Sequence, residues 1–577
     1  MRIGHLLHIV WLLGAASSIA AQDTIVVSPP AITSHNGMVL CSSDLACDVG
    51  ARILAKGGNA VDAAVATAFA MAVTYPAAGN LGGGGFMVVK APSRVTTFDF
   101  RERAPLQSTP TMYLDSAGNI NRRLTSTGYL APGVPGTPRG LELAHRRYGK
   151  LPWRDIVAPA AALARAFPLS DALARSLNRE VERNMAAYPA SVAAYGKPDG
   201  GQWVAGDTIR LTDLARTLNA IASGGADAFY TGWIADSLAA DMARNGGMIS
   251  KADLAAYVAK ERAPVQGKFR GYDVYSMPPP SSGGVALVEM LNLMELADVR
   301  QQPRFSPRTL HYSIEAMRLA FLDRARHLGD PDFVTVPVAE LTSREHATKL
   351  MRLIDPDRAS ASVSLAPELM AAATAGESEE TTHISVVDAN GMGVALTYTL
   401  EGGFGSHVVG RGTGVLLNNE MGDFNKKPGF TSLTGDIGTP ANVIEPGKRM
   451  LSSMTPTIVT RNGNLVLVTG SPGGRTIINT VFNVVLNVLG YDMDIRAAVD
   501  APRYHHQWLP DSATFEANAL PDSTAERLQT MGHGVRMRGG QGDAHSIRYD
   551  AKTRTATGAN DFRSADSKVS VPPADNR

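Results

Sequence analysis

The chain has 577 residues, of which 44% are apolar and 19% are charged. This length exceeds one ordinary domain core, and the composition is that of a globular protein, which excludes a disordered one. Because 55 lysines and arginines stand against 54 aspartates and glutamates, the net charge is only +1. We therefore expect neither nucleic acid nor an anionic membrane surface as a partner, since both are bound through a basic field.

Residues 1–21 have the layout of a secretory signal peptide. Arg2 supplies the positive start, residues 6–14 are apolar, and Ser18-Ile19-Ala20 forms a small-x-small cleavage site. The apolar run is too short to span a bilayer, and no later run of about twenty apolar residues occurs. We predict export across the inner membrane, to the periplasm, with an uncleaved membrane anchor as the alternative.

Cys41 and Cys47 are the two cysteines of the chain. In an oxidising compartment they can form a disulfide, which would close a short loop and add little chain entropy. Two free buried thiols are the alternative, and the sequence does not decide between them. The cysteines lack partners for a zinc site and no HExxH pattern occurs, so we predict no metal and no cofactor.

Most of the chain before Thr381 has apolar residues at helical spacing between turns rich in glycine and proline. Gly57-Gly58 separates the first two helices, and Asn59 is the expected N-cap of the second. Helices are expected over residues 49–56, 60–73, 152–167, 171–185, 211–223, 233–244 and 308–327, and strands over 38–41, 86–90 and 96–100.

The glycine-rich segment 79–86 joins a helix to a strand. It lacks the Lys-Ser/Thr of a phosphate loop and the glycine spacing of a dinucleotide site, so we interpret it as close backbone packing. Arg101 ends the strand at 96–100 and, facing a cleft, suits a bidentate contact with a carboxylate. Solvated charge is nevertheless the default expectation for residues 101–105.

From Thr381 onward strands dominate, and β-branched runs on both sides of Asn390-Gly391 predict a β-hairpin. Residues 564–577 are polar and are expected to form a frayed tail. Because strands occur on both sides of Thr381, we expect one sheet shared by the two parts, in layers of helices on sheets on helices. Strands are expected at 384–388, 393–400, 413–418, 455–460 and 464–469, and a helix at 476–489.

Thr381 opens the first strand of the hairpin and follows a polar run at 371–380. A cut before Thr381 would make it an N-terminal residue, whose α-amine can take the proton of its own hydroxyl. Such a residue is nucleophile and base at once. For these residues alone, the alternative is a surface loop that enters a hairpin.

Three later segments carry groups that suit acyl chemistry. Glu420 and Asp423 are carboxylates three residues apart between apolar anchors, where they can hold a cationic amine. Ser452-Ser453 offers adjacent hydroxyls before a strand. Gly473-Gly474 lies between a strand and a helix, and two backbone N–H groups at a helix start are suited to an oxyanion hole.

These motifs, in this order, resemble those of the γ-glutamyltranspeptidases of the N-terminal-nucleophile hydrolase superfamily. The resemblance covers nearly the whole mature chain, and it implies an α/β (α+β) fold: a four-layer αββα sandwich shared by two autoproteolytic subunits. The matching stretches are GGNAVDAAVA (57–66), GNLGGGGF (79–86), FRERAP (100–105), PGVPG (132–136), PPPSSGG (278–284), TTHISVVD (381–388), NNEMGDF (418–424), LSSMTPTI (451–458), GSPGG (470–474) and APRYHHQWLP (501–510).

The resemblance implies an inactive precursor that cleaves itself between Glu380 and Thr381. The products would be a large subunit over residues 22–380 and a small subunit over 381–577, held together as a heterodimer. Thr381 would then attack the γ-amide of glutathione or another γ-glutamyl compound. Water, or an amino-acid or dipeptide acceptor, would resolve the γ-glutamyl-enzyme.

The same resemblance assigns roles to the other site residues. The α-carboxylate of the donor would bind Arg101, Ser452 and Ser453. Its α-amine would bind Asp423, Glu420 and Glu401. The oxyanion donors would be the N–H groups of Gly473 and Gly474, and Thr399 would hydrogen-bond the nucleophile. No metal is implied.

Some positions depart from the family pattern or fall outside it. Glu401 stands where many relatives have asparagine, which adds negative charge near the amine site. Thr434 lies in the lid-length loop 428–438 where an aromatic gate residue often stands, and this puts closure of the lid in doubt. His505-His506 is expected to be structural, because the mechanism needs no histidine base.

Two alternatives stay open. One is a related acylase for glutaryl-cephalosporin-like amides, or a poly-γ-glutamate hydrolase. The acylase is disfavoured, because a substrate with a free α-amino-acid end is indicated by Arg101, Asp423 and Ser452-Ser453. The other is an unprocessed, inactive binding protein, which the presence of Thr381, Thr399 and the glycine pair disfavours.

Overall fold

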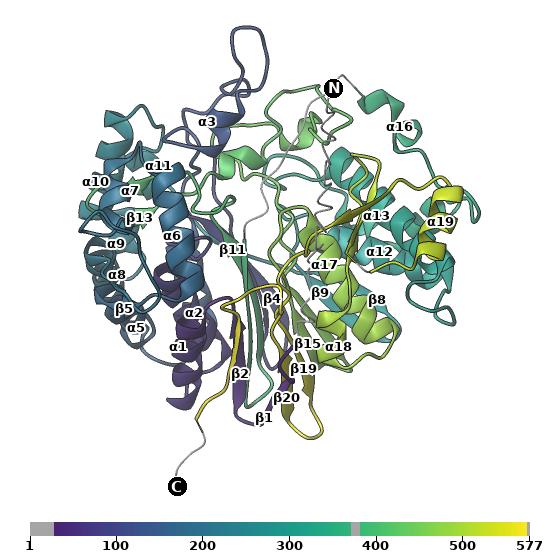
Figure 1. Cartoon of the computed structure of the whole chain (residues 1–577), viewed down its shortest axis with the longest axis horizontal. Helices are drawn as coiled ribbons and strands as arrows, with labels where there is room; N and C mark the ends of the chain where they lie inside the picture. Colours follow the sequence, from purple (N-terminus) through teal and green to yellow (C-terminus); the bar gives the residue numbers. More distant parts are fainter. Residues whose placement is uncertain (1–27, 371–380, 518, 574–577) are drawn as a thin grey trace, which may run out of the picture.

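The computed structural model of the protein describes residues 28–370, 381–517 and 519–573. Two seven-stranded sheets lie face to face, and helices cover the outer face of each (Figure 1). The predicted signal peptide and Glu380 lie outside the described residues. Within the described ranges, no helix combines the length and the apolar character needed to cross a bilayer.

The first sheet has the order β21-β2-β10-β11-β3-β4-β7 and is packed against α1 (Asp44–Ala55) and α2 (Ala60–Thr74). Asn59 caps α2, its side chain accepting from the backbone N–H groups of Val61 and Asp62, as predicted. The strands are β2 (Gly37–Cys41), β3 (Gly84–Lys90), β4 (Val95–Phe100), β7 (Lys260–Arg262), β10 (Thr382–Asp388), β11 (Gly393–Thr399) and β21 (Lys568–Ser570).

The second sheet has the order β1-β20-β19-β15-β14-β9-β8. Its outer face packs on α12 (Gly283–Ala297), α13 (Pro307–His327) and α17 (Thr476–Val485). The strands are β1 (Ile32–Ser34), β8 (Val265–Phe269), β9 (Tyr272–Ser276), β14 (Thr457–Arg461), β15 (Asn464–Thr469), β19 (Ser546–Asp550) and β20 (Thr555–Ala559).

A third apolar core lies between the two sheets. Val88 and Val387 of the first sheet meet Ile458 and Val468 of the second there. On β10, the neighbouring Val386 belongs instead to the core beneath α1 and α2, because successive side chains of a strand point to opposite faces. Strands buried on both faces explain the near-continuous apolar runs of the sequence. The four layers are therefore helices, sheet, sheet, helices.

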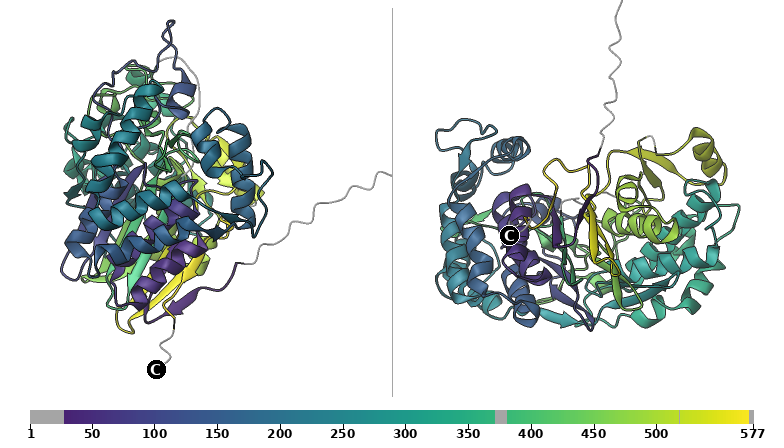
Figure 2. Two further views of the ribbon diagram at one scale, coloured as in Figure 1. Left: turned by 90° about the vertical axis from the view of Figure 1, so that its left-hand side faces the viewer. Right: turned by 90° about the horizontal axis from the view of Figure 1, so that it is seen from below.

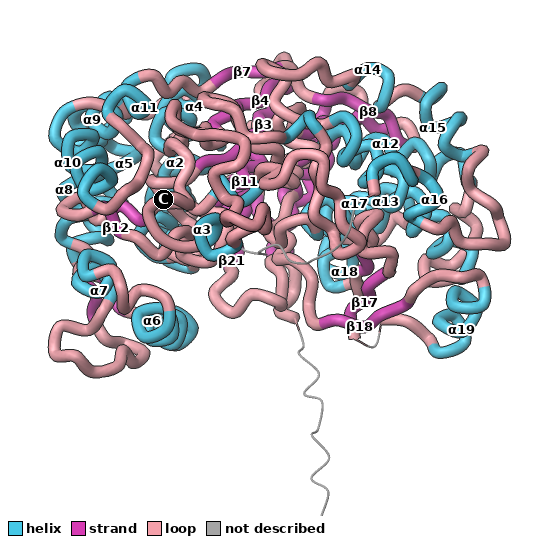
Figure 3. Tube along the Cα trace, turned by 90° about the horizontal axis from the view of Figure 1, so that it is seen from above, coloured by secondary structure: helices cyan, strands magenta, loops and turns pink. Residues whose placement is uncertain are grey.

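The other elements surround this sandwich (Figures 2 and 3). On the side of α1 and α2 they include α6 and α7, which project from the body as an arm, and on the side of α12 and α13 they include α15 and α19. The further helices are α3 (Arg122–Ser126), α4 (Thr137–Tyr148), α5 (Trp153–Arg165), α6 (Asp171–Arg183), α7 (Pro189–Tyr195), α8 (Thr212–Gly224), α9 (Asp227–Tyr230), α10 (Gly232–Arg244), α11 (Lys251–Ala255), α14 (Val338–Leu341), α15 (Arg344–Met351), α16 (Ser362–Leu365), α18 (Ile495–Asp500) and α19 (Asp522–Thr530). The further strands are β5 (Phe167–Pro168), β6 (Thr208–Ile209), β12 (Val409–Gly410), β13 (Val415–Leu416), β16 (Tyr504–His505), β17 (Ala513–Glu516) and β18 (Val535–Arg538).

The predicted sharing of a sheet across residue 381 is confirmed, and it holds for both sheets. In the first, β10 pairs with β2 and β11 pairs with β3; in the second, β14 pairs with β9. The two parts of the chain therefore build a common core. A cut before Thr381 would leave both products bound through these strand pairs.

Three sequence expectations need correction or completion. The tail at 564–577 is not frayed throughout, because β21 pairs with β2 and buries Val569, while the Lys568 ammonium lies 2.8 Å from the Asp48 carboxylate. The strand expected at 413–418 is only the two residues of β13. Cys41 and Cys47, which the sequence left open, form a disulfide between β2 and α1.

Candidate active site

A cavity at the start of β10 and the end of β11 collects nearly all the predicted site residues. Gly473 directly precedes the lining residue Gly474 without lining the cavity itself, and Glu380 lies outside the described residues. The lining comprises Arg101, Thr381, Thr399, Glu401, Glu420, Asp423, Ser452, Ser453, Met454, Gly474, Arg475 and Ile477.

Thr381 and Thr399 face each other across the β10–β11 pair. The register pairs Thr382 with Tyr398, which brings the preceding Thr381 opposite the end of β11. The Thr381 hydroxyl donates to Thr399 Oγ1 at 3.3 Å, and Thr399 Oγ1 also accepts from the Glu401 backbone N–H at 2.8 Å. Thr381 is 5% exposed. Its hydroxyl is thus oriented by a neighbour whose own hydroxyl is fixed by the backbone.

The glycine-rich segment supports Thr399 from behind. A Cβ on Gly83 would lie 2.1 Å from the Thr399 carbonyl oxygen, so a side chain is excluded there. The Asn80 amide donates to the same carbonyl at 2.9 Å. The predicted close backbone packing of residues 79–86 is confirmed, and it fixes the end of β11 on which Thr399 stands.

Arg101 is surrounded by carboxylates. Its Nη1 lies 2.7 Å from Glu420 Oε2 and 3.6 Å from Glu102 Oε2, and its Nη2 pairs with Asp423. Arg101 and Glu102 are 1% and 0% exposed, so the default expectation of solvated charge is wrong at these two positions. Burial is tolerated because the guanidinium and the carboxylates compensate each other.

Carboxyl groups outnumber the Arg101 guanidinium in this cluster, since Glu401 also lines the cavity. Burial, opposed by Arg101, raises the pKa of Glu102 to about 8. Burial likewise raises the pKa of the Glu420 carboxyl well above its ordinary value. A bound cation would favour ionisation of these carboxyl groups, so the cavity is suited to an ammonium group.

We expect Glu102→Gln to change how stability depends on pH. The native state holds a proton on Glu102 up to about pH 8, whereas the unfolded chain loses it near 4.5. Stability is therefore lost as pH rises through this window, and the variant escapes that loss. Urea unfolding of both proteins between about pH 5 and pH 8 should show the variant gaining roughly 2 kcal/mol or more relative to wild type. A constant difference across the window would contradict the raised pKa.

Ser452-Ser453 is held by the segment 278–284. Ser452 N donates to the Pro280 carbonyl at 2.9 Å, and its own carbonyl accepts from Ser282 N at 2.8 Å. Ser453 Oγ accepts from Arg324 Nη2 at 3.2 Å, and Arg324 Nε donates to Ser282 Oγ at 3.0 Å. Arg324 therefore adds a second cation beside the hydroxyl pair. No motif of the sequence points to Arg324, because its only signal there is one charge in a helix assigned from its apolar face.

Gly473 and Gly474 form the turn between β15 and α17. Their φ angles are 128° and 54°, in the region that favours glycine. The Gly473 carbonyl accepts from Thr476 N at 3.0 Å, which closes the first turn of the helix. The backbone N–H groups of this turn lie at a helix N-terminus, where they favour negative charge.

The loop 428–438 lines a second cavity that shares Asp423 and Arg475 with the first. Arg475 Nη1 donates to the Gly435 carbonyl at 2.8 Å, and Arg122 Nη2 contacts both carboxylate oxygens of Asp436 at 2.9 and 2.8 Å. Thr434 lines this cavity. Polar contacts therefore anchor the loop directly after Thr434, at Gly435 and Asp436.

His505 and His506 lie outside the lining of either cavity. Asn479 Nδ2 lies 2.7 Å from His505 Nδ1, and burial holds the pKa of the two rings at about 3 and about 4. Both are neutral, buried rings near α17. The expectation that they are structural agrees with these contacts.

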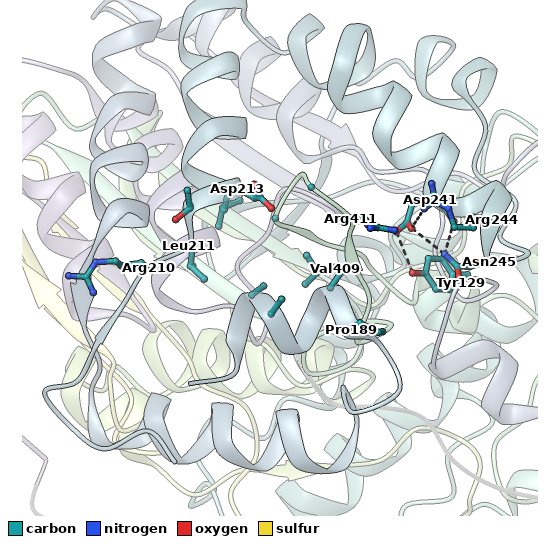
Figure 4. Close-up of a pocket in the computed structure, with 17 residues that line it drawn as sticks. Tyr129, Pro189, Arg210, Leu211, Asp213, Asp241, Arg244, Asn245, Val409 and Arg411 are labelled. Carbon is teal, nitrogen blue, oxygen red and sulfur yellow. Dashed lines mark hydrogen bonds and ion pairs between the residues drawn. The ribbon is translucent and has the colours of Figure 1, made fainter. Parts of the chain in front are cut away.

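A larger cavity of about 730 Å³ lies elsewhere, between α7, α8, α10 and the β12–β13 pair (Figure 4). Asp241 organises one end of it, contacting Tyr129, Arg244 and the Arg411 backbone N–H. No predicted site residue lines it. Size alone therefore does not identify the reactive site.

Comparisons with known proteins agree with this geometry. A family model described as Gamma-glutamyltranspeptidase matches residues 46–571. The glutathione hydrolase proenzyme of Escherichia coli (strain K12) is 44% identical over 537 residues, covering 93% of this chain and 92% of that protein.

Two solved structures are also similar. The cephalosporin acylase from Bacillus halodurans superposes with a TM-score of 0.82 at 26% identity and covers 96% of this chain and 98% of its own. The γ-glutamyltranspeptidase of Helicobacter pylori has a TM-score of 0.54 at 44% identity, over 55% of this chain and 91% of its own.

Proposed function

The chain belongs to the γ-glutamyltranspeptidase family, and from this membership we propose that Thr381 is the nucleophile of a self-maturing γ-glutamyl transferase. The protein is an enzyme of the γ-glutamyltransferase and glutathione hydrolase type. The observation that carries the residue assignment is the hydrogen bond between the Thr381 and Thr399 hydroxyls inside the carboxylate-rich cavity.

Maturation begins with attack of the Thr381 hydroxyl on the carbonyl carbon of Glu380. The peptide C–N bond breaks as the C–O bond forms, which leaves an ester and a free α-amine on Thr381. Water then hydrolyses the ester, so that Glu380 becomes a carboxylate and Thr381 an N-terminal residue. The products are the large subunit (22–380) and the small subunit (381–577), and the strand pairs across both sheets support a stable heterodimer.

Turnover uses the same hydroxyl. The Thr381 α-amine, with an ordinary pKa of about 8, takes the hydroxyl proton as oxygen attacks the γ-carbonyl of the donor. Backbone N–H groups of Gly473 and Gly474 bind the developing oxyanion. The leaving amine takes a proton and departs, and water or an amino group of an acceptor then attacks the γ-glutamyl ester and regenerates Thr381.

Donor recognition follows from the charges of the cavity. The α-ammonium of a γ-glutamyl group would bind Asp423, Glu420 and Glu401, which line the cavity together. Its α-carboxylate would bind Arg101 and the Ser452-Ser453 hydroxyls, with Arg324 behind Ser453. Glutathione and other γ-glutamyl compounds carry both groups at a fixed distance from the γ-amide.

The acylase alternative is supported by the similarity to the cephalosporin acylase structure. That fold is common to both activities, so the decision rests on the site. A glutaryl group has no α-ammonium, and binding it here would leave the carboxylate excess around Arg101 uncompensated. The γ-glutamyl donor is the better fit.

Cleavage of the signal at 1–21 and a periplasmic location complete the proposal for an exported enzyme.

Turnover of a γ-glutamyl anilide, with and without a dipeptide acceptor, tests the proposal. We expect aniline release without acceptor, a faster release with it, and a γ-glutamyl-dipeptide product in the second case. A denaturing gel of the same sample should show two bands. One full-length band with no aniline release would support the unprocessed binding protein instead.

A further inference from the structure

Three ionisable side chains meet within the helical layer that covers the second sheet. Glu289 lies on α12, Asp323 on α13 and His346 on α15. Their metal-ligating atoms all lie within 4.8 Å of one another. None of the three lines the cavity around Thr381 or the one beneath residues 428–438.

The Glu289 carboxylate has no partner of its own. The residue is fully buried, and among the residues that the structure describes neither carboxylate oxygen has a hydrogen-bond partner. The nearby Asp323 carboxylate is 5% exposed. A buried carboxylate without a partner is costly, so it must hold either a proton or a cation.

No protein cation supplies this charge. Across residues 28–370, 381–517 and 519–573, no lysine or arginine forms an ion pair with Glu289 or Asp323. The one cationic candidate is His346, whose Nε2 lies 2.6 Å from Asp323 Oδ2. With both carboxylates ionised and the imidazole neutral, the three side chains carry two negative charges, which one divalent ion would balance.

We propose that Glu289, Asp323 and His346 bind a divalent transition-metal ion of the zinc class. Carboxylate oxygen and imidazole nitrogen are ligands that zinc accepts together, at about 2.0–2.2 Å from the ion. Ligand atoms within 4.8 Å of one another reach a common ion by small side-chain rotations. His346 would bind the ion through Nε2 as a neutral ring that carries its proton on Nδ1.

The backbone around the three ligands is already fixed. Asn292, one turn after Glu289 on α12, donates to the Thr342 carbonyl at 3.0 Å and so holds the start of α15. Ser343 caps α15 by accepting from the His346 backbone N–H at 3.0 Å. The ion would join three packed helices, which is a structural role. It would also fix the turn of α13 on which Arg324, the residue after Asp323, reaches Ser453.

A second buried group provides an internal contrast. The ligand atoms of His311, Glu315 and His533 also lie within 4.8 Å of one another. There, Arg318 Nε lies 3.2 Å from Glu315 Oε1, and the two imidazoles contact each other at 2.8 Å. This group already has its own cation, so it serves as a control.

The experiment measures zinc binding by purified, matured protein that has been dialysed against a chelator. We expect wild type to bind one Zn²⁺ per chain by calorimetry and elemental analysis, and its unfolding temperature to rise on addition of zinc. Glu289→Gln keeps the shape but removes the charge, and it should weaken the Kd at least about 100-fold and abolish the thermal shift, because a ligand is lost. The partly exposed His346→Gln provides the same test if the first variant fails to fold. His533→Gln should bind zinc as wild type does.

Two results would overturn the proposal. Wild type that binds no zinc would overturn it, and a Glu289→Gln variant of equal or greater stability would then show that Glu289 is simply protonated. Binding that survives Glu289→Gln and His346→Gln but is lost in His533→Gln would place the ion in the second group.

Discussion

Replacing Thr381 with alanine is expected to leave a single full-length chain and to lower the turnover of a γ-glutamyl anilide by at least about 10⁴-fold. The variant lacks the hydroxyl that attacks Glu380 and, later, the donor. Thr399 is not expected to replace it, since its Oγ1 is held by the Glu401 backbone N–H at 2.8 Å. A denaturing gel and an aniline-release assay measure both effects on one preparation.

Thr381→Ser is the matched control. It keeps the hydroxyl and the α-amine and loses only a methyl group, so we expect cleavage and measurable turnover to persist at a reduced rate. Mass spectrometry of its small subunit should give residue 381 as the first residue. If Thr381→Ala still separates into two chains, or if the small subunit of wild type starts elsewhere, the nucleophile has been assigned to the wrong residue.

The elements that the sequence predicts well are those with strong local signals. The break at Gly57-Gly58 and the cap at Asn59 define α1 and α2, and the Asn390-Gly391 turn defines the β10–β11 hairpin. The start of α1 at Asp44 and the short β13 depend on packing, which periodicity does not report. β21 was missed because its polar residues are stabilised by pairing with β2 and by Asp48 rather than by their own pattern.

The sequence predicts the site residues that stand in a recognisable motif. It does not predict charged residues that the fold brings together from distant parts of the chain. Thr381, Asp423 and Ser452-Ser453 stand in recognisable stretches and line one cavity. Arg324 lines the adjoining cavity, and its place beside Ser453 depends on how α13 packs. The same limit applies to Glu289, Asp323 and His346. Their numbers are far apart, no short motif links them, and the sequence therefore predicted no metal.

Asp423→Asn is expected to lower kcat/KM for a γ-glutamyl anilide by about 10²- to 10³-fold, mainly through a higher KM. Asn has the shape of Asp but no charge, and truncating one side of a buried charge pair costs about 2–5 kcal/mol. The Asp423 side chain is 24% exposed and lines both cavities, so it can meet the donor directly. Arg101 also contacts Glu420 at 2.7 Å, so the guanidinium keeps a partner in the variant.

A glutaryl anilide separates recognition of the ammonium from a general loss of structure, because it lacks only the α-amine. Wild type should strongly prefer the γ-glutamyl compound, whereas Asp423→Asn should change glutaryl turnover by less than about 3-fold and so lose most of the preference. Glu445→Gln, at a half-exposed carboxylate paired with Lys448, should alter neither substrate. Equal losses on both anilides would mean that Asp423 acts by positioning Arg101, and a wild type without preference would favour the acylase. The carboxylate excess around Arg101 is the physical basis for choosing an amino-acid donor, and this pair of substrates measures it directly.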